Sequence, residues 1–240
     1  MVVNLEDWPW PERTFMARLS PQSRKALLAL GTQVFYEPGR AVMKQGALGT
    51  TTYLLRSQDT RLTACAKITT ADDKLLGIRV SGDVVGYLGA LDPTARRSST
   101  DTTCTATIVH HIPGAVFENF LNHHADAWQA LCRTIADRLA WSEARRLDFG
   151  DRPVNLRLAR LLVEFAEAYG RYTTRSGADR PEIEITIRLS YEEVGDLIGA
   201  GVDAVGLAMR DLRTAHLAQL RNRRLVVQDL EGLRKYAELT

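Results

Sequence analysis

Hydrophobic and polar positions change their spacing several times along the chain. Between residues 15 and 30, apolar residues stand among polar neighbours at spacings that predict one or two short helices. From Thr32 to Ile112, short apolar runs alternate with turn sequences such as Pro38-Gly39 and Ser81-Gly82-Asp83. Many short strands separated by turn residues predict an antiparallel sandwich or barrel.

A helical spacing begins after Pro113 and continues to Gly150. Its apolar residues recur three and four positions apart, which is typical of a helix that packs against another helix. Because a helix of this length extends beyond the face of a small barrel, we expect it to pair with its copy in a second chain, with packing on its own domain as the alternative. The expected dimer contacts are Trp128, Leu131, Ile135, Leu139 and Ser142.

The C-terminal part of the chain predicts a second domain that is mainly helical. An amphipathic helix spans residues 154–169, and alternation over residues 183–187 predicts a half-buried strand. Ser190 and Glu193 have the spacing of a capping box, in which each side chain bonds the backbone N–H of the other residue, so a helix should begin there. After a glycine-containing turn at residues 199–201, a second apolar stripe predicts another helix.

Two short helices joined by a glycine-containing turn are typical of a helix-turn-helix. The residues that follow predict a hairpin whose tip, from Arg221 to Arg224, is basic, like the wing of a winged helix. The second helix of such a unit fits the major groove of DNA, while cations on the wing and the capped helix start contact phosphates. The alternative is a solvent-exposed basic face on a helical domain.

The composition is that of an ordinary folded protein with one or two domains, because 45% of the 240 residues are hydrophobic and 25% are charged. The 31 Lys and Arg residues nearly balance the 29 Asp and Glu residues, so any basic surface must be local. The wide spacing of Cys65, Cys104 and Cys132 offers neither a disulfide framework nor a CxxC site. The sequence also lacks a secretory signal and a membrane-spanning stretch, so we expect a cytoplasmic protein with no membrane partner.

No arrangement of residues typical of an enzyme occurs in the sequence. We find no Ser/His/Asp or Cys/His constellation and no glycine-rich phosphate loop. The adjacent pairs His110-His111 and His123-His124 would point in different directions on a strand or a helix, so neither pair chelates one metal readily. We therefore expect no catalytic residues, no metal site, and histidines that lie on the surface or are partly buried.

Several short motifs occur in a fixed order along the chain. They are Ser81-Gly82-Asp83-Val84-Val85-Gly86, Arg97-Ser98, Ile112-Pro113, Arg157-Leu158-Ala159, Leu189-Ser190 and Ile198-Gly199-Ala200. In order and spacing, the chain resembles the Crp/Fnr family of bacterial transcription regulators over nearly its whole length. The resemblance implies an α+β fold with three parts: an antiparallel β-barrel of the cyclic-nucleotide-binding, jelly-roll type (residues 1–112), a long dimerisation helix (113–150), and a winged helix-turn-helix (151–240).

By this resemblance, Arg97 and Ser98 would bind a phosphate, as the corresponding Arg-Ser pair does in cAMP-responsive members. The glutamate that holds the ribose in those members is absent, because Gly86-Tyr87-Leu88 stands there, and Trp141-Ser142 replaces the Thr-Ser pair that meets adenine. We therefore do not expect cAMP, and a different nucleotide-like small effector or no ligand are the open alternatives. The expected effector contacts are Gly86, Tyr87, Leu88, Arg97, Ser98, Trp141 and Ser142.

The second helix of the helix-turn-helix also departs from the family. Members commonly begin it with Ser-Arg-Glu and carry a second arginine further on, whereas here Leu207 stands at the position of that arginine. Because arginine reads guanine through a two-pronged contact, the known family operator is not predicted, and phosphate contacts remain. The expected DNA contacts are Ser190, Gly201, Val202, Asp203, Ala204, Leu207, Arg210, Arg221 and Arg223.

We expect a homodimeric, DNA-binding transcription regulator in which the barrel and the long helix set the placement of two winged helices, each at a half-site about one DNA turn from the other. The expected partners are double-stranded DNA and a second copy of the chain, with RNA polymerase as a further candidate. The competing hypothesis is a ligand- or protein-binding regulatory dimer that has lost sequence-specific DNA recognition. The missing base-reading arginines favour this alternative, and the basic wing opposes it.

Overall fold

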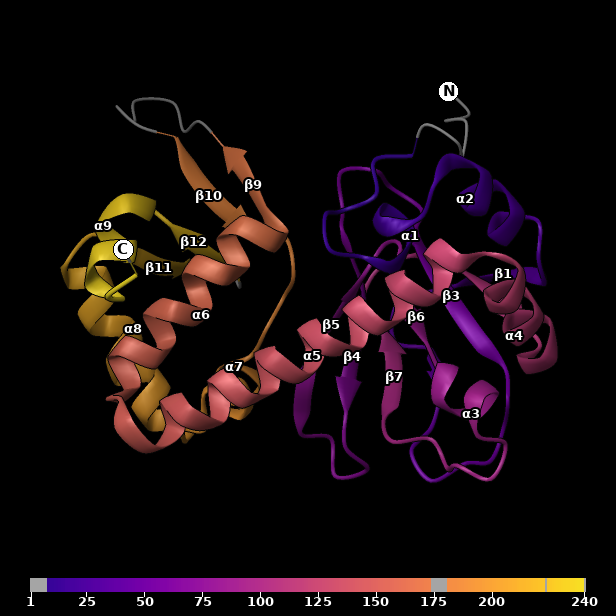
Figure 1. Cartoon of the computed structure of the whole chain (residues 1–240). Helices are drawn as coiled ribbons and strands as arrows, with labels where there is room; N and C mark the ends of the chain where they lie inside the picture. The colour runs from indigo at the N-terminus through magenta and orange to yellow at the C-terminus, as the bar shows by residue number, and fades with distance from the viewer. Residues whose placement is uncertain (1–7, 174–180, 223, 240) are drawn as a thin grey trace. The chain divides into compact units, whose positions relative to one another are not determined.

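The computed structural model describes residues 8–173, 181–222 and 224–239 of the chain (Figure 1). These residues belong to two compact units, which divide between Ala140 and Trp141. The division falls inside the long helix that the sequence predicts after Pro113, so this helix supplies residues to both units.

The first unit consists of two four-stranded antiparallel sheets with helices packed against one of them (Figure 1). The sheets have the strand orders β1-β8-β3-β6 and β2-β7-β4-β5. The predicted antiparallel β-domain is thus confirmed, and the one or two helices predicted before it are two. The elements up to the long helix are α1 (Phe15–Arg18), α2 (Pro21–Leu28), β1 (Thr32–Tyr36), β2 (Ala41–Met43), β3 (Thr52–Ser57), β4 (Ala64–Thr69), β5 (Leu75–Val80), β6 (Val84–Val85), α3 (Tyr87–Leu91), β7 (Thr100–Thr103), β8 (Thr107–Ile112) and α4 (Gly114–His123).

Alternation along the strands divides the core of this unit into two clusters. Leu54 on β3 faces the helices and packs in one cluster with Phe15 and Phe117. The next residue, Leu55, lies between the two sheets with Cys65 and Val85. Successive side chains of a strand point to opposite faces, so one strand serves both clusters.

The long helix differs from its prediction in where it begins and in what it covers. Helix α4 ends at His123, and the extended backbone of His124 separates it from α5 (Ala125–Asp151). Leu131 is fully buried in the core of the first unit, and Trp128 and Ile135 are partly buried against the same core. The prediction that Leu131 contacts a second chain is therefore wrong, because no part of it is accessible. Leu139, by contrast, is 58% exposed.

The second unit joins a four-stranded antiparallel sheet of order β11-β12-β10-β9 to four helices of the described chain and to the end of α5 (Figure 1). The predicted helix ending at Gly170, the strand, the two helices and the hairpin are all present. The elements are α6 (Val154–Tyr169), β9 (Gly170–Thr173), β10 (Glu182–Ile185), α7 (Tyr191–Ile198), α8 (Val202–Thr214), β11 (Ala218–Arg221), β12 (Arg224–Val227) and α9 (Leu230–Tyr236).

The turn between α7 and α8 depends on two glycines. Gly199 ends α7 in the left-handed conformation (φ 63°), which glycine adopts without steric strain. Gly195 lies one turn earlier in α7, where a Cβ atom would stand 2.3 Å from the carbonyl oxygen of Ala200. At the start of α7 the predicted capping box between Ser190 and Glu193 is confirmed, with Ser190 Oγ accepting from the Glu193 backbone N–H and Glu193 accepting from that of Ser190.

The close approach at Gly195 predicts that Gly195→Ala lowers the free energy of unfolding by about 1 to 3 kcal/mol, the usual cost of overpacking. Gly150→Ala is the matched control, because a Cβ there meets nothing within 4 Å and alanine is the better helix former. Urea unfolding of the full chain, followed by circular dichroism, measures both variants. Equal stabilities would contradict a tight turn at Gly195.

Candidate effector pocket and nucleic-acid interface

The first unit contains a small cavity, of about 60 Å³, beside the segment that joins β6 to α3. Five of the predicted effector residues line it, namely Gly86, Tyr87, Leu88, Arg97 and Ser98. The other residues of its wall are Met43, Arg79, Val85, Gly89, Arg96, Ser99, Asp101 and Arg138. The structure therefore brings together the residues before β7 and those around α3, as the resemblance implies.

Arg97 is almost fully buried, and its guanidinium binds the protein itself. Nη1 donates to the carbonyl oxygen of Gly86 at 2.6 Å, and Nη2 donates to that of Thr51 at 2.7 Å. The guanidinium also lies 5.6 Å from the centre of the Tyr53 ring. Gly86 has a φ of 74°, and a Cβ atom on it would stand 2.5 Å from Arg97 Nη1. Glycine at this position therefore allows the arginine to approach the backbone.

Three charged residues of the cavity carry no sequence signal and were not predicted. Arg138 reaches the cavity from α5, where Nη2 donates to Asp83 Oδ1 at 3.1 Å and Nη1 donates to the Tyr87 hydroxyl at 3.3 Å. Arg79 comes from β5, and Asp101 from β7. They lie on separate elements with no shared motif, so only the packing of the first unit brings them together.

The carboxyl of Asp101 is buried within this group of arginines. Its side chain accepts a hydrogen bond from Ser99 Oγ at 2.8 Å. Burial raises the pKa of Asp101 to about 6, against the opposing effects of the Ser99 hydrogen bond and of the charges on Arg79, Arg138 and Arg97. The carboxyl can therefore gain or lose a proton near neutral pH.

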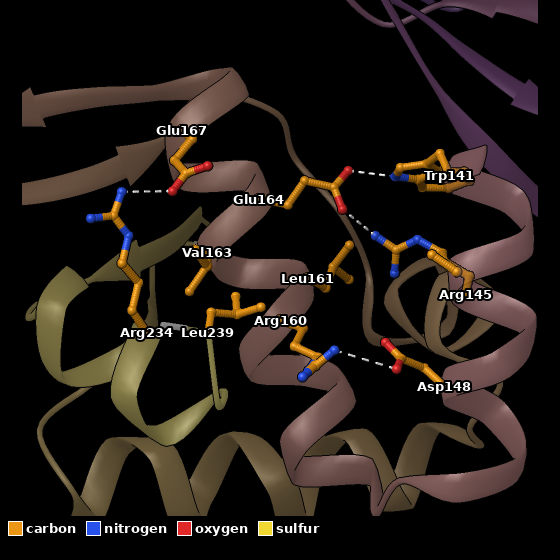
Figure 2. A pocket seen from close by; sticks show the side chains of 11 residues that line it. Trp141, Arg145, Asp148, Arg160, Leu161, Val163, Glu164, Glu167, Arg234 and Leu239 are labelled. Atoms are coloured by element: carbon orange, nitrogen blue, oxygen red, sulfur yellow. Dashed lines mark hydrogen bonds and ion pairs between the residues drawn. The ribbon is translucent and has the colours of Figure 1, made fainter. Parts of the chain in front are cut away.

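Trp141, a sixth predicted effector residue, lines a different cavity. This second cavity, of about 540 Å³, lies in the second unit among α5, α6 and the C-terminal residues (Figure 2). The Trp141 indole donates to Glu164 at 2.6 Å, and Arg145 donates to the same carboxylate at 2.8 Å. The guanidinium of Arg145 also stacks over the Trp141 ring. Ser142, the seventh, is exposed and lines neither of these two cavities.

The cations of the larger cavity are each paired with a carboxylate. Arg160 lies 3.5 Å from Asp148, and Arg234 lies 2.8 Å from Glu167 (Figure 2). Arg145, besides Glu164, donates to the carbonyl oxygen of Leu197 at the end of α7. These contacts connect the end of α5 to α6 and α7, and they account for the charged groups without a ligand.

The exposed side of α8 carries most of the predicted DNA contacts. Val202 is 48% exposed and Leu207 is 56% exposed, and Asp203 and Arg210 are exposed between and beyond them. Ala204 is only half-buried. The opposite side of α8 is buried in the core through Val205, Ala208, Met209 and Leu212. Ser190 and Gly201 are exposed at the helix starts.

The predicted wing is the hairpin of β11 and β12, and its basic residues meet acidic ones on β10. Arg221 forms an ion pair with Glu182, and Arg224 forms one with Glu184. The sequence alternation that predicts β10 contains both glutamates, but pairing across the sheet cannot be read from it. Arg223 lies outside the described residues.

One histidine prediction needs correction. His110, on β8, is fully buried and not partly exposed, and both of its ring nitrogens lack a hydrogen-bond partner in the described structure. Burial, assisted by Arg56, lowers the pKa of His110 to about 4, so its ring is neutral near pH 7. Among the described residues, no cluster of three or more His, Cys, Asp or Glu side chains suits a metal ion, and no helix has the length and apolarity to cross a bilayer.

Comparisons with known proteins agree with this architecture. A model of the Crp-like helix-turn-helix domain matches residues 156–236. A CRP-like cAMP-activated global transcriptional regulator of Mycobacterium tuberculosis is 25% identical over 219 residues, covering 91% of this chain and 94% of that protein. The c-di-GMP responsive global regulator CLP of Xanthomonas campestris has a similar solved structure, with a TM-score of 0.67, 19% identity, and coverage of 88% of this chain and 100% of that one.

A second solved structure, a Crp/Fnr-family transcriptional regulator of Thermus thermophilus, has a TM-score of 0.66 and 15% identity, with coverage of 86% of this chain and 98% of that one. At these identities the structures show a shared fold. The sequence relative covers both units, and the family model covers the helix-turn-helix and its wing.

The raised pKa of Asp101 predicts how stability depends on pH. The folded chain holds the Asp101 proton more tightly than the unfolded chain, so its contribution to stability is present below about pH 4 and is lost as pH rises through 6, by about 3 kcal/mol in all. The stability of wild type minus that of Asp101→Asn should fall by this amount between pH 4 and pH 7. Taking the difference cancels the opposite trend of His110, whose lowered pKa removes stability as pH falls from 6.5 to about 4.

Urea titrations of the full chain at several pH values measure this difference. Asp72→Asn is the control for the loss of one exposed surface carboxylate. A difference that stays constant across the range would show that Asp101 titrates as an ordinary exposed carboxyl.

Proposed function

Because this chain belongs to the Crp/Fnr family of transcription regulators, we propose that it acts as a homodimer whose two α8 helices enter adjacent major grooves of one DNA duplex. The observation that carries the proposal is the exposed side of α8 (Val202–Thr214), which follows a glycine-dependent turn and a capped helix. In a helix-turn-helix, this second helix contacts base edges with its N-terminal residues. Any effector would act by binding one arrangement of the dimer more tightly than the other.

The chemistry of α8 favours an operator unlike that of members that read guanine with arginine. Val202 and Leu207 present exposed apolar surface, which suits the methyl group of thymine. Asp203 is exposed in the first turn and carries a carboxylate, which accepts a hydrogen bond from the amino group of cytosine. The half-site contacted by the start of α8 should therefore be read through thymine and cytosine.

Ser190 and Arg210 are more available for phosphate contacts than the arginines of the wing. Arg210 is exposed on α8, two turns beyond Asp203. Arg221 is held by Glu182, so a phosphate would have to replace a carboxylate in that pair. Ser190 lies at the start of α7, and its hydroxyl already accepts from Glu193 N, which leaves its proton to donate.

The dimer would form along the exposed side of α5. Leu131 is buried, whereas Cys132, Ala136 and Leu139 are exposed at spacings of four and three residues, which is the spacing of a helix-helix seam. Leu139 is the large apolar residue of this group. Burying it against the copy in a second chain would stabilise the dimer by removing its side chain from water.

A second candidate function is a regulatory dimer that binds a ligand or a protein without reading a DNA sequence. The first turns of α8 expose no Arg, Asn or Gln, and the wing residue Arg221 is paired with an acid. Genome-wide immunoprecipitation separates the two, because a sequence-reading regulator enriches a common motif. Contact with RNA polymerase beside such sites is a further part of the first proposal, and transcription in vitro tests it.

One prediction of the proposed function concerns phosphate binding by α8. Arg210→Ala should weaken binding to all DNA sequences and reduce the slope of log affinity against log salt by about one, the change expected for one lost phosphate contact. Asp203→Asn should change the preferred sequence while keeping that slope. Fluorescence anisotropy with duplexes selected from genomic fragments measures both, and Arg61→Ala, an exposed arginine of the first unit, is the control. Unchanged affinity of Arg210→Ala at every salt concentration would remove α8 from the interface.

A further prediction of the proposed function concerns the dimer. Leu139→Glu should shift the solution mass toward that of one chain, because it places a charge in the proposed seam, whereas Leu48→Glu, at a residue 64% exposed elsewhere in the first unit, should not. A short bismaleimide should crosslink two chains through the exposed Cys132 thiol, and Cys132→Ser should abolish the product. Sedimentation and denaturing gels provide the readouts. A wild-type chain of single mass that still binds operator DNA would overturn the dimer.

A further inference from the structure

The cavity in the first unit has a strongly cationic wall. Among the described residues, four arginines and one aspartate line it: Arg79, Arg96, Arg97, Arg138 and Asp101. Asp101 is buried and has a raised pKa, so its negative charge is partly lost near pH 6. Buried cations are normally paired with anions or hydrogen-bonded. Arg97 donates to two carbonyl oxygens and Arg138 is paired with Asp83, while Arg96 is exposed and donates to the carbonyl oxygen of Gly46.

Arg79 is the least satisfied of these arginines. Its Nη1 donates to the carbonyl oxygen of Ile78, the residue before it, at 3.2 Å. Its Nε is buried and has no hydrogen-bond partner among the described residues. Burial, and then the charge of Arg138, lower the pKa of Arg79. A guanidinium with a free, buried donor beside a cavity is a group that an anion would stabilise.

The size of the cavity limits what the anion can be. Sites for drug-sized ligands enclose about 300 to 1,000 Å³, whereas this cavity holds only about 60 Å³. Arg97 occupies the neighbouring space and is fixed to the Gly86 and Thr51 carbonyl oxygens. An ion of three or four heavy atoms is therefore a better match for this volume than a nucleotide.

We propose that this cavity binds a small inorganic oxyanion, of the size of nitrate or bicarbonate, held by Arg79 and Arg138. The fork of donors on a guanidinium matches the spacing of two oxygens on such an ion. One part of this inference rests on the proposed function, namely that the anion is the effector of the regulator. The binding site itself depends on Arg79, Arg138 and Asp101, which are not residues of the predicted phosphate site.

The position of Arg138 gives the anion a route to the long helix. Arg138 belongs to α5, and its guanidinium donates to Asp83 and to Tyr87. An anion in the cavity competes with Asp83 for its guanidinium. The anion is thus bound partly by the helix on which the proposed dimer depends. Dimer formation should therefore change the affinity for the anion, and anion binding should change the affinity between the two chains by the same factor.

Binding of the anion should depend on pH through Asp101. The groups that face its carboxyl are Arg79 from β5, Arg138 from α5, Arg97 and Ser99 from the segment before β7, and, around the same cavity, Tyr87, Asp83 and Arg96. Only Asp101 in this set has a pKa raised to about 6. Its protonation removes the negative charge that repels the anion, so binding should strengthen as pH falls from 8 to 6.

Isothermal calorimetry on the full chain tests the proposal with sodium nitrate as the probe, and with bicarbonate at pH 8 as a second one. Sodium gluconate keeps the ionic strength constant, because gluconate is too large for the cavity. Wild type should bind nitrate about tenfold more tightly at pH 6 than at pH 8. Arg79→Gln should lose at least about tenfold in affinity, whereas Arg61→Gln, an exposed arginine paired with Asp59 in the same unit, should bind as wild type does.

Asp101→Asn keeps the test decisive if Arg79→Gln does not fold. This variant should bind nitrate more tightly than wild type at pH 8 and should show no change between pH 8 and pH 6. The inference is overturned if neither anion gives heat with wild type, if Arg79→Gln binds normally, or if cAMP binds at micromolar concentration with Arg79 replaced.

DNA binding of the same preparations separates this inference from the proposed function. A chain that binds its operator but no small anion overturns the anion site alone. A chain that binds nitrate in the predicted way but no DNA sequence overturns the proposed function and leaves the anion site standing.

Discussion

Arginine side chains that donate to backbone carbonyl oxygens hold the functional regions of both units. The last carbonyl groups of a helix have no partner within the helix and carry partial negative charge. Arg157 donates to Ile198 and Gly199 at the end of α7, and Arg145 donates to Leu197 beside them. Arg97 likewise donates to the carbonyl oxygens of Gly86, just before α3, and of Thr51, just before β3. Because most of these contacts join residues more than 40 positions apart in the sequence, they fix the turn of the helix-turn-helix and the wall of the cavity in the first unit.

Local signals in the sequence were sufficient to predict most of the elements and their order, although α3, β9 and α9 were not predicted. Short apolar runs between turn residues identified the strands of the first unit, and alternation identified β10. The spacing of apolar residues identified helices, and Ser190 with Glu193 identified the start of α7, because each of these patterns acts over a few residues. The charged wall of the cavity could not be predicted, since Arg79, Asp101 and Arg138 are isolated polar residues on three elements. For the same reason the sequence could not show that Glu182 pairs with Arg221, which depends on the order of strands in a sheet.

The long helix shows how a correct pattern can be assigned to the wrong neighbour. The spacing of Trp128, Leu131 and Ile135 correctly indicated a packed helix face, but this face covers the core of its own unit. A helix presents the same periodicity whether the opposing surface belongs to its own chain or to a copy. Only the burial of Leu131 and the exposure of Leu139 distinguish the two sides. The cavity illustrates a related point, because the Arg97-Ser98 pair that resembles a phosphate-binding motif is present while the arginine donates to backbone carbonyl oxygens.

The ion pairs between the wing and β10 bear on how such a regulator finds its target. Non-specific affinity for DNA comes almost entirely from cations that displace counterions along the backbone. With Arg221 and Arg224 held by glutamates, fewer positive charges are available to grip arbitrary sequences. A genome offers roughly a million or more competing sites. A lower non-specific affinity therefore leaves a larger share of the molecules unbound and able to reach the specific site. A small number of copies per cell would then suffice to occupy a promoter.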